Sequence, residues 1–214
     1  ELAEGAAPLP ADHDLLLLEE ELWSAIYRPR GRHWETPFDD LEGSLRALIV
    51  PHAGYVYSAP IAATAYAALL DPRRAGVVRR VAVFGPAHTV ALEGIAIPSA
   101  DAFSTPLGSV GVDGELRARA TQVPRVVVDD RAHAREHSVE VQLPFLQVLV
   151  PEATVLPIVV GRSSAGEVAR LVESMWDARD SLVVLSTDLS HYETYSEAAQ
   201  SRFTVYRPAS EDEA

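Results

Sequence analysis

The sequence predicts one α/β domain built around a largely parallel β-sheet. From Arg46 onward, short runs rich in β-branched residues alternate with longer amphipathic segments, which is the pattern of βαβ units. A chain of 214 residues with 48% hydrophobic content can bury a substantial core but is short for two full domains. We therefore expect a single domain over residues 46–200, an irregular lead-in over 1–45 and an acidic, poorly ordered tail over 201–214.

Strands and helices are expected to alternate along this domain. The predicted strands are short aliphatic runs at 46–50, 80–84, 94–97, 125–128, 154–160 and 181–186. The predicted helices lie at 12–23, at 59–70 before Asp71-Pro72, at 136–149 and at 164–179. Pro144 should kink the third of these helices or mark a restart.

Composition and charge exclude several classes of function. The net charge of −13 argues against a nucleic-acid partner, because such binding depends on clustered cations. The chain contains neither cysteine nor lysine, which removes disulfides, thiolate ligands and nucleophiles, and Schiff-base chemistry. Apolar runs are far shorter than the roughly 20 residues that cross a bilayer, and the acidic N-terminus is unlike a signal peptide. We expect no membrane association and a cytoplasmic location.

Side chains that can bind metals follow three of the predicted strands. The first, second and sixth strands are followed by His52, by His88 and by Asp188 with His191. Because open α/β sheets bind ligands beyond the carboxyl ends of their strands, we expect these residues at one rim. A single histidine after a strand is more often an ordinary loop residue. Three histidines in equivalent positions are much less easily explained by chance. Imidazole with carboxylate suits zinc or iron(II), whereas calcium and magnesium prefer oxygen ligands alone.

A second histidine cluster occupies residues 133–140. His133 and His137 are four residues apart, as are Glu136 and Glu140, so each pair would share a face of a helix. The spacing is not the HExxH motif of zinc proteases, whose glutamate directly follows the first histidine. We expect His137, nearer the apolar run, to take the more buried role. A solvated helix start is an equal alternative for His133, and the glutamates could simply pair with the helix dipole.

Serine chemistry is the competing interpretation of the residues near these histidines. Ser58, Ser138, Ser186 and Ser190 each lie close to a histidine in the sequence. The sequence contains no G-x-S-x-G elbow and no glycine-rich phosphate loop. Neither a serine hydrolase nor a nucleotide site is therefore predicted.

Six ordered motifs carry a family resemblance. They are PHAGYVYSAPIAATAY at 51–66, FGPAH at 84–88, STPLGSVGVD at 104–113, EHSVEVQLPFLQ at 136–147, LPIVVG at 156–161 and LSTDLSHY at 185–192. Together they resemble the Memo family, which includes the bacterial and archaeal proteins called AmmeMemoRadiSam system protein B. The resemblance runs from about Arg46 to Tyr192.

The resemblance implies a three-layer α/β/α sandwich around a central, mostly parallel sheet, similar to the class III (LigB-type) extradiol dioxygenases. Those enzymes hold a non-haem iron with two histidines and a carboxylate, and further histidines act as acid or base. His52 and His88 match the metal-ligating histidines, His191 and Asp188 match the pocket's last histidine and aspartate, and His137 matches another pocket histidine. The resemblance thus implies a metal held by His52, His88 and His191, with His191, His137 and Asp188 as catalytic groups.

The resemblance has gaps at both ends of the chain. The Memo family usually supplies a cysteine near its C-terminus where the dioxygenases have the glutamate ligand, and that cysteine is absent here. The family's region beyond about Ala199 and its N-terminal A-G-x-F-Y-P segment are not recognisable either. We expect a site with two or three protein ligands.

Three functions follow from the resemblance and the residues together. The first is a metal-dependent redox or dioxygenase-like enzyme, with iron the expected metal and copper or zinc as alternatives. The second is a non-catalytic binding or scaffold protein that takes a small molecule or peptide and acts with radical-SAM and AMMECR1-like proteins, as the family name implies. The third is a zinc-dependent hydrolase with Asp188 or Glu136 as base. Tyr55 and Tyr192 are expected to line the pocket.

Overall fold

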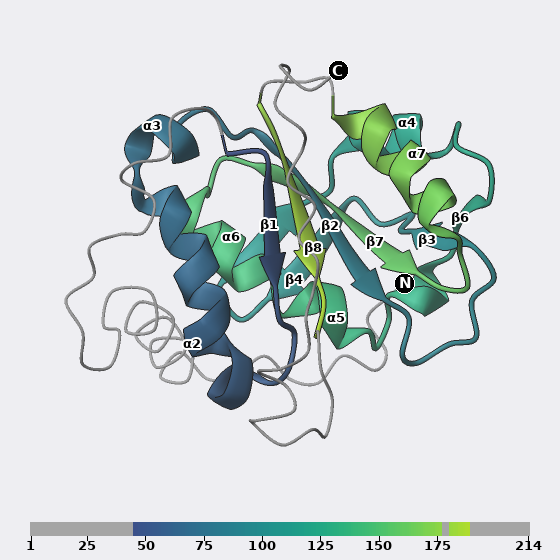
Figure 1. The fold of residues 1–214 in the computed structure, drawn as a ribbon, viewed down its shortest axis with the longest axis horizontal. Helices are drawn as coiled ribbons and strands as arrows, with labels where there is room; N and C mark the ends of the chain where they lie inside the picture. Colours follow the sequence, from purple (N-terminus) through teal and green to yellow (C-terminus); the bar gives the residue numbers. More distant parts are fainter. Residues whose placement is uncertain (1–44, 177–179, 189–214) are drawn as a thin grey trace, which may run out of the picture.

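The computed structural model of the chain describes residues 45–176 and 180–188 (Figure 1). Its six-stranded sheet has the order β1-β8-β2-β7-β3-β6. The strands are β1 (Ala47–Val50), β2 (Arg80–Pro86), β3 (Ile95–Ile97), β6 (Val126–Val128), β7 (Thr154–Val160) and β8 (Ser181–Ser186). Every neighbouring pair is parallel except β7 and β3. The predicted sheet and its six predicted strands are confirmed.

Helices cover both faces of the sheet. They are α2 (Tyr55–Tyr66), the 3-10 helix η1 (Ala67–Leu70), α3 (Pro72–Ala75), α4 (Gly114–Ala120), the 3-10 helix η2 (Asp130–Ala132), α5 (His137–Glu140), α6 (Leu143–Leu149) and α7 (Ala165–Met175). One core cluster joins the sheet to α2, α5 and α6, and a second joins it to α4 and α7. The structure is therefore the expected α/β sandwich.

Strand β2 shows why the central strands are continuous apolar runs. Val81 and Val83 belong to the core cluster under α2 and α6, whereas Ala82 and Phe84 belong to the cluster under α4 and α7. Successive side chains point to opposite faces, and both faces are covered, so no position from Val81 to Phe84 favours a polar residue.

One helix begins earlier than predicted, and the predicted interruption at Pro144 is found. Helix α2 begins at Tyr55 rather than at residue 59, with Pro60 inside it on an exposed face. Because proline is best tolerated in the first turn of a helix, the sequence favoured a later start. The restart predicted at Pro144 is confirmed. The helix is interrupted between α5 and α6, and Pro144 lies in the first turn of α6.

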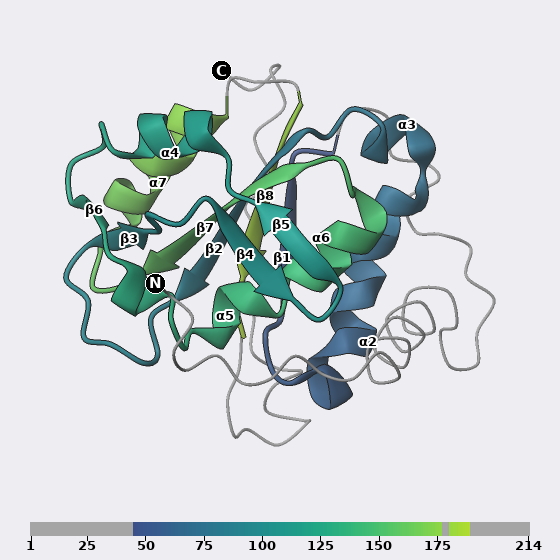
Figure 2. The ribbon, with the colours of Figure 1, turned by 180° about the vertical axis from the view of Figure 1, so that it is seen from behind.

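A β-hairpin was missed. Strands β4 (Ala102–Thr105) and β5 (Gly108–Gly111) form a separate antiparallel sheet, which Figure 2 shows beside α6. Most of its residues are exposed or half-buried, so it lacks the apolar alternation that marks a strand. Gly108 closes the turn at φ +110°, a conformation that favours glycine.

The parallel order brings four strand ends to one edge of the sheet. Strands β1, β8, β2 and β7 run in the same direction, and Val50 at the end of β1 pairs with Ser186 at the end of β8. Segments that leave these ends therefore start side by side. A shallow apolar hollow between η1, α3 and the end of α6 lies near the opposite, amino-terminal ends of β2 and β7.

Several expectations fall beyond the described part of the chain. The helix at 12–23, the tail at 201–214 and the lead-in up to residue 44 lie outside the described residues. Among the helices that are described, none combines the length and the apolar character needed to span a bilayer.

Candidate metal centre

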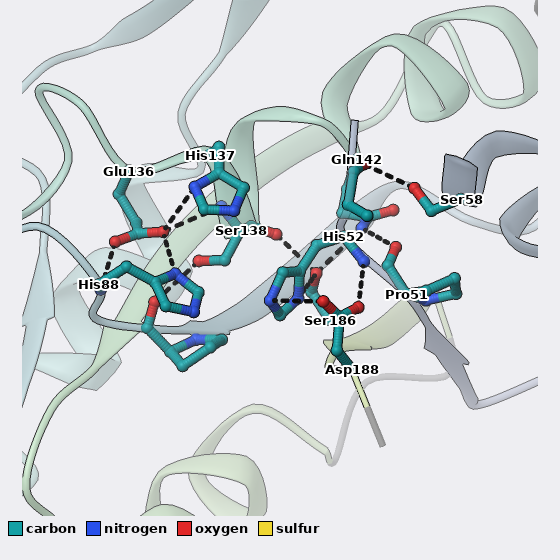
Figure 3. Close-up of polar contacts among 12 residues, drawn as sticks. Pro51, His52, Ser58, His88, Glu136, His137, Ser138, Gln142, Ser186 and Asp188 are labelled. Carbon is teal, nitrogen blue, oxygen red and sulfur yellow. Dashed lines mark hydrogen bonds and ion pairs between the residues drawn. The ribbon is translucent and has the colours of Figure 1, made fainter. Parts of the chain in front are cut away.

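Three histidines from three different elements meet at the carboxyl edge of the sheet. His52 follows β1, His88 follows β2, and His137 is the first residue of α5. One ring nitrogen from each lies within 4.8 Å of the other two. Figure 3 shows the three rings turned toward a common space. His52 is 2% exposed, whereas His88 and His137 have side-chain exposures of 38% and 50%, so the cluster is buried on one side and open on the other.

The rings are close enough to influence one another. The centroids of His88 and His137 lie 4.9 Å apart in a stacked arrangement, and His52 lies 5.3 Å from His88 and 5.7 Å from His137, edge-on to both. The three rings therefore form one compact cluster, in which each imidazole lies within electrostatic reach of the other two.

Glu136 holds the open side of the cluster. Its Oε1 accepts a hydrogen bond from Nδ1 of His88 at 2.8 Å, and its Oε2 accepts one from the backbone N–H of His88 at 2.6 Å. Oε1 also accepts from the backbone N–H of Ser138 at 3.0 Å, which caps α5. Burial opposes ionisation of this carboxyl, but the hydrogen bonds from His88 and Ser138 outweigh burial and lower the pKa of Glu136 to about 2. Glu136 is therefore an anion at neutral pH.

Asp188 and Ser186 hold the buried side. The backbone N–H of His52 donates to Oδ1 of Asp188 at 2.9 Å, and Nδ1 of the His52 ring lies 3.1 Å from Oγ of Ser186. The other ring nitrogen, Nε2, lies 3.8 Å from Oδ2 of Asp188. Burial lowers the pKa of His52, against the opposing effect of Asp188, and the neighbouring histidines lower it further. The ring is therefore neutral at neutral pH.

The position of α5 depends on a glycine in β2. A Cβ at Gly85 would lie 2.4 Å from Oγ of Ser138 and 3.0 Å from Cγ1 of Val139. The same Ser138 hydroxyl donates to the carbonyl of Pro86 at 2.9 Å. Only glycine lets the first turn of α5 approach this closely, and that approach brings Glu136 and His137 to the end of β2.

The predicted site residues have different outcomes. His52 and His88 lie together, and Asp188 contacts His52, at the rim where the strand order predicts them. His191 and Tyr192 lie outside the described residues, so their roles stay predictions. Tyr55 donates its hydroxyl to the carbonyl of Val141 at 3.2 Å and packs against a neighbouring phenylalanine ring, and burial raises its pKa. Its place as a pocket residue also stays a prediction.

The expected burial of the 133–140 cluster was wrong. His133 is the buried histidine, with ring nitrogens 3.1 Å from the carbonyl of Asp129 and 3.3 Å from that of Pro157, while His137 is half exposed. Helical spacing does not apply here, because η2 ends at Ala132, before His133, and α5 begins at His137. Glu136 between them is extended, so the two histidines do not share a helix face.

Sequence reasoning did not single out Gln142. This side chain is fully buried and donates from Nε2 to Oγ of Ser186 at 2.9 Å, one contact away from His52. A signal existed, since a glutamine inside the apolar run VQLPFL must find hydrogen-bond partners if it is buried.

Comparison with known proteins supports the family resemblance. The family model of Memo-like protein matches residues 29–211. A MEMO1 family protein of Aquifex aeolicus is 40% identical over 157 residues, which cover 72% of this chain and 57% of the relative. One of Metallosphaera sedula is 38% identical over 155 residues, covering 69% and 54%, and one of Thermococcus kodakarensis is 31% identical over 193 residues, covering 86% and 62%.

The chain thus spans about half to three fifths of the length of these relatives. The part that matches contains His52, His88 and His137, so the histidine cluster lies within the shared region of the family model. With a family match that covers most of its residues, this chain belongs to the Memo family.

Proposed function

We propose that this protein binds one divalent transition metal between His52, His88 and His137 and uses it in a redox reaction. The observation that carries the proposal is the convergence of three imidazole nitrogens within 4.8 Å. Metal–nitrogen bonds of about 2.0–2.1 Å place two such ligands at most about 4.2 Å apart. Metal binding would draw the three nitrogens closer together, and the less constrained His137 is the ring that would rotate.

The donor set determines the class of metal. Imidazole nitrogens suit iron, copper and zinc, whereas magnesium and calcium prefer oxygen. The sequence has no cysteine, so no thiolate of this chain can compete. Iron is the first expectation, from the resemblance to extradiol dioxygenases, and copper and zinc are the alternatives.

The residues around the cluster have separable tasks in this proposal. A bound iron or copper would supply electron transfer or oxygen chemistry. Glu136 and Asp188 orient His88 and His52, which are the fixed ligands. His137 is less constrained, because its Nδ1 lies 3.6 Å from Oε1 of Glu136, beyond hydrogen-bonding distance. We therefore take His137 as the adjustable third ligand and assign the movement of protons to His191, as a prediction from the sequence.

Two other functions use the same cluster differently. As a scaffold, the site would bind a small molecule or peptide in the cytoplasm and act with radical-SAM and AMMECR1-like proteins. As a zinc hydrolase, it would need a carboxylate base near a bound water. Glu136 does not suit that role, because His88 and Ser138 already occupy its oxygens. Asp188 is then the only candidate of the two bases considered.

The test is elemental analysis of protein purified without a His tag and without added metal. We expect close to one equivalent of iron or copper in the wild-type protein and none in the His52→Ala/His88→Ala variant. The matched control is His13→Ala/His33→Ala, which removes two imidazoles elsewhere and should retain the metal.

Zinc in place of iron or copper would favour the hydrolase. No metal in any sample, even after anaerobic loading with iron(II), would contradict metal binding and favour the scaffold.

A further inference from the structure

We propose that Gln142 and Ser186 are positioning residues that keep the single proton of the His52 ring on Nδ1 and so direct the Nε2 lone pair into the histidine cluster. The role given to these two residues rests on the proposed metal-binding function. The location of the proton, however, is a property of the metal-free protein and can be measured alone.

The direction of the hydrogen bonds begins at a backbone carbonyl. Nε2 of Gln142 lies 2.9 Å from the carbonyl oxygen of Pro51. A carbonyl oxygen can only accept, so the amide NH₂ and not the amide oxygen must face Pro51. The hydroxyl of Tyr66 donates to the oxygen of the same amide at 3.0 Å. This contact agrees with the orientation of the amide that Pro51 requires. The second N–H of Gln142 then donates to Oγ of Ser186 at 2.9 Å.

A second backbone carbonyl fixes the proton of Ser186. Its Oγ lies 2.6 Å from the carbonyl oxygen of Ser138, which again can only accept. The single hydroxyl proton of Ser186 is therefore committed to Ser138. Oγ retains two acceptor positions, one of which receives the N–H of Gln142.

The remaining acceptor position determines the tautomer of His52. Nδ1 of His52 lies 3.1 Å from Oγ of Ser186, which has no proton left to donate. The contact is a hydrogen bond only if Nδ1 carries the proton. A neutral imidazole has one ring proton, so with that proton on Nδ1 the lone pair is on Nε2. Figure 3 shows this chain of contacts from Gln142 through Ser186 to His52.

The resulting electrostatics favour a cation. Nε2 of His52 lies 3.8 Å from a carboxylate oxygen of Asp188. A nitrogen of the same ring lies within 4.8 Å of one nitrogen of His88 and one of His137. Electron-rich atoms face one another across this space. A positive ion there would interact favourably with all of them.

His88 reaches the same state by a different route. Its Nδ1 lies 2.8 Å from Oε1 of Glu136, and a carboxylate oxygen accepts, so Nδ1 is the donor and Nε2 is the ring nitrogen left for a metal. A carboxylate accepts the ring proton of the open histidine, whereas a neutral hydroxyl accepts that of the buried one. Groups that hydrogen-bond to a metal-binding histidine set the tautomer of that histidine. Their removal commonly weakens metal binding by about 10–100-fold.

The experiment uses the full chain with ¹⁵N-labelled histidine. Long-range ¹H–¹⁵N spectra of the metal-free protein report which ring nitrogen of His52 carries the proton, and titration with Zn²⁺ alone reports affinity. We expect Nδ1–H in the wild type. Ser186→Ala should give a mixture of tautomers and bind zinc about 10–100-fold more weakly. Gln142→Met, which keeps the bulk of the side chain, should move both readouts in the same direction.

The control is Ser181→Ala, at the start of the same strand. Ser181 is also buried, and among the described residues its hydroxyl has no hydrogen-bond partner. This variant should match the wild type in both readouts. A proton on Nε2 of wild-type His52, or tautomer populations unchanged in both Ser186→Ala and Gln142→Met, would overturn the inference. If the wild type shows Nδ1–H but binds no zinc, the positioning of the proton is upheld and metal binding is refuted.

Discussion

The two sides of the histidine cluster are held by different chemistry. His52 is 2% exposed, and its Nδ1 contacts a buried hydroxyl that is itself backed by a buried amide, while Asp188 accepts from its backbone N–H. His88, after β2, and His137, on α5, are open to solvent beside the ionised carboxylate of Glu136, which accepts from the His88 ring. A buried network of hydrogen bonds fixes the His52 ring in one geometry, while the open His137 ring, which lies beyond hydrogen-bonding distance of Glu136, can still rotate. The buried side is therefore the rigid part of the cluster, and the open side is where a ligand can approach.

The largest effect should come from Glu136→Ala. It removes the acceptor of two backbone N–H groups and of the His88 ring at once. We expect a loss of about 3–5 kcal/mol in the free energy of unfolding, measured with urea. Glu140→Ala, an exposed glutamate in the same helix, is the control and should change stability by less than about 0.5 kcal/mol. Equal losses in the two variants would show that Glu136 has no special role on the open side.

Acid should weaken the two sides in separate pH ranges. Burial lowers the pKa of His52 from its usual 6.5. As the pH falls, His52 is therefore protonated in the unfolded chain before it is protonated in the folded protein. The free energy of unfolding should fall as the pH drops below about 6.5. The pKa of Glu136 is lowered from 4.5 to about 2, so its contribution is present above about pH 4.5 and is lost between about 4.5 and 2.

Urea unfolding of the metal-free protein from pH 7 to 3 checks these ranges. His52→Gln should reduce the slope between pH 6.5 and 5, and Glu136→Gln should reduce it only below pH 4.5. If either variant changed the slope in the other's range, the two sides would not be independent.

Gly85→Ala should disturb the open side selectively. The new methyl group meets Ser138 and Val139, which pushes α5 away from β2. We expect a loss of about 2 kcal/mol and shifted NMR signals for His88 and His137, with a smaller change at His52. Gly114→Ala, where a Cβ meets nothing within 4 Å, is the control and should leave all three signals in place. A larger change at His52 than at His137 would contradict this division of the cluster.

The smallest effect should come from Tyr66→Phe on the buried side. It leaves the amide oxygen of Gln142 without its buried donor but keeps the backbone contacts that orient the amide. We expect a loss of about 1 kcal/mol and an unchanged Nδ1–H tautomer of His52. Tyr57→Phe, at an 81% exposed position, should have no measurable effect on stability. A switched tautomer in Tyr66→Phe would mean that the phenol, and not Pro51, orients Gln142.

The sequence predicted the sheet and its rim because both follow from local patterns. Central strands such as β2 and β7 are buried on both faces, which produces unmistakable apolar runs. Parallel order then brings the residues after β1, β2 and β8 together, so the meeting of His52 and His88 and the contact of Asp188 with His52 needed no further information.

The rest depends on contacts between distant segments. His137 joins the cluster because α5 packs against Gly85, and nothing in the spacing of residues 133–140 shows that approach. Extended backbone at Glu136 reversed the expected burial of His133 and His137. Most residues of the β4–β5 hairpin are exposed or half-buried, so its sequence does not alternate between apolar and polar residues. Long-range packing of this kind is not encoded in local periodicity.

The most direct measurement of the central claim is the position of a metal in crystals of the full chain. An anomalous difference map recorded at the zinc edge after soaking with Zn²⁺ should contain one strong peak about 2.0–2.1 Å from Nε2 of His52, Nε2 of His88 and a ring nitrogen of His137. A peak bound through Nδ1 of His52 or His88, or zinc bound only at other sites, would contradict the account.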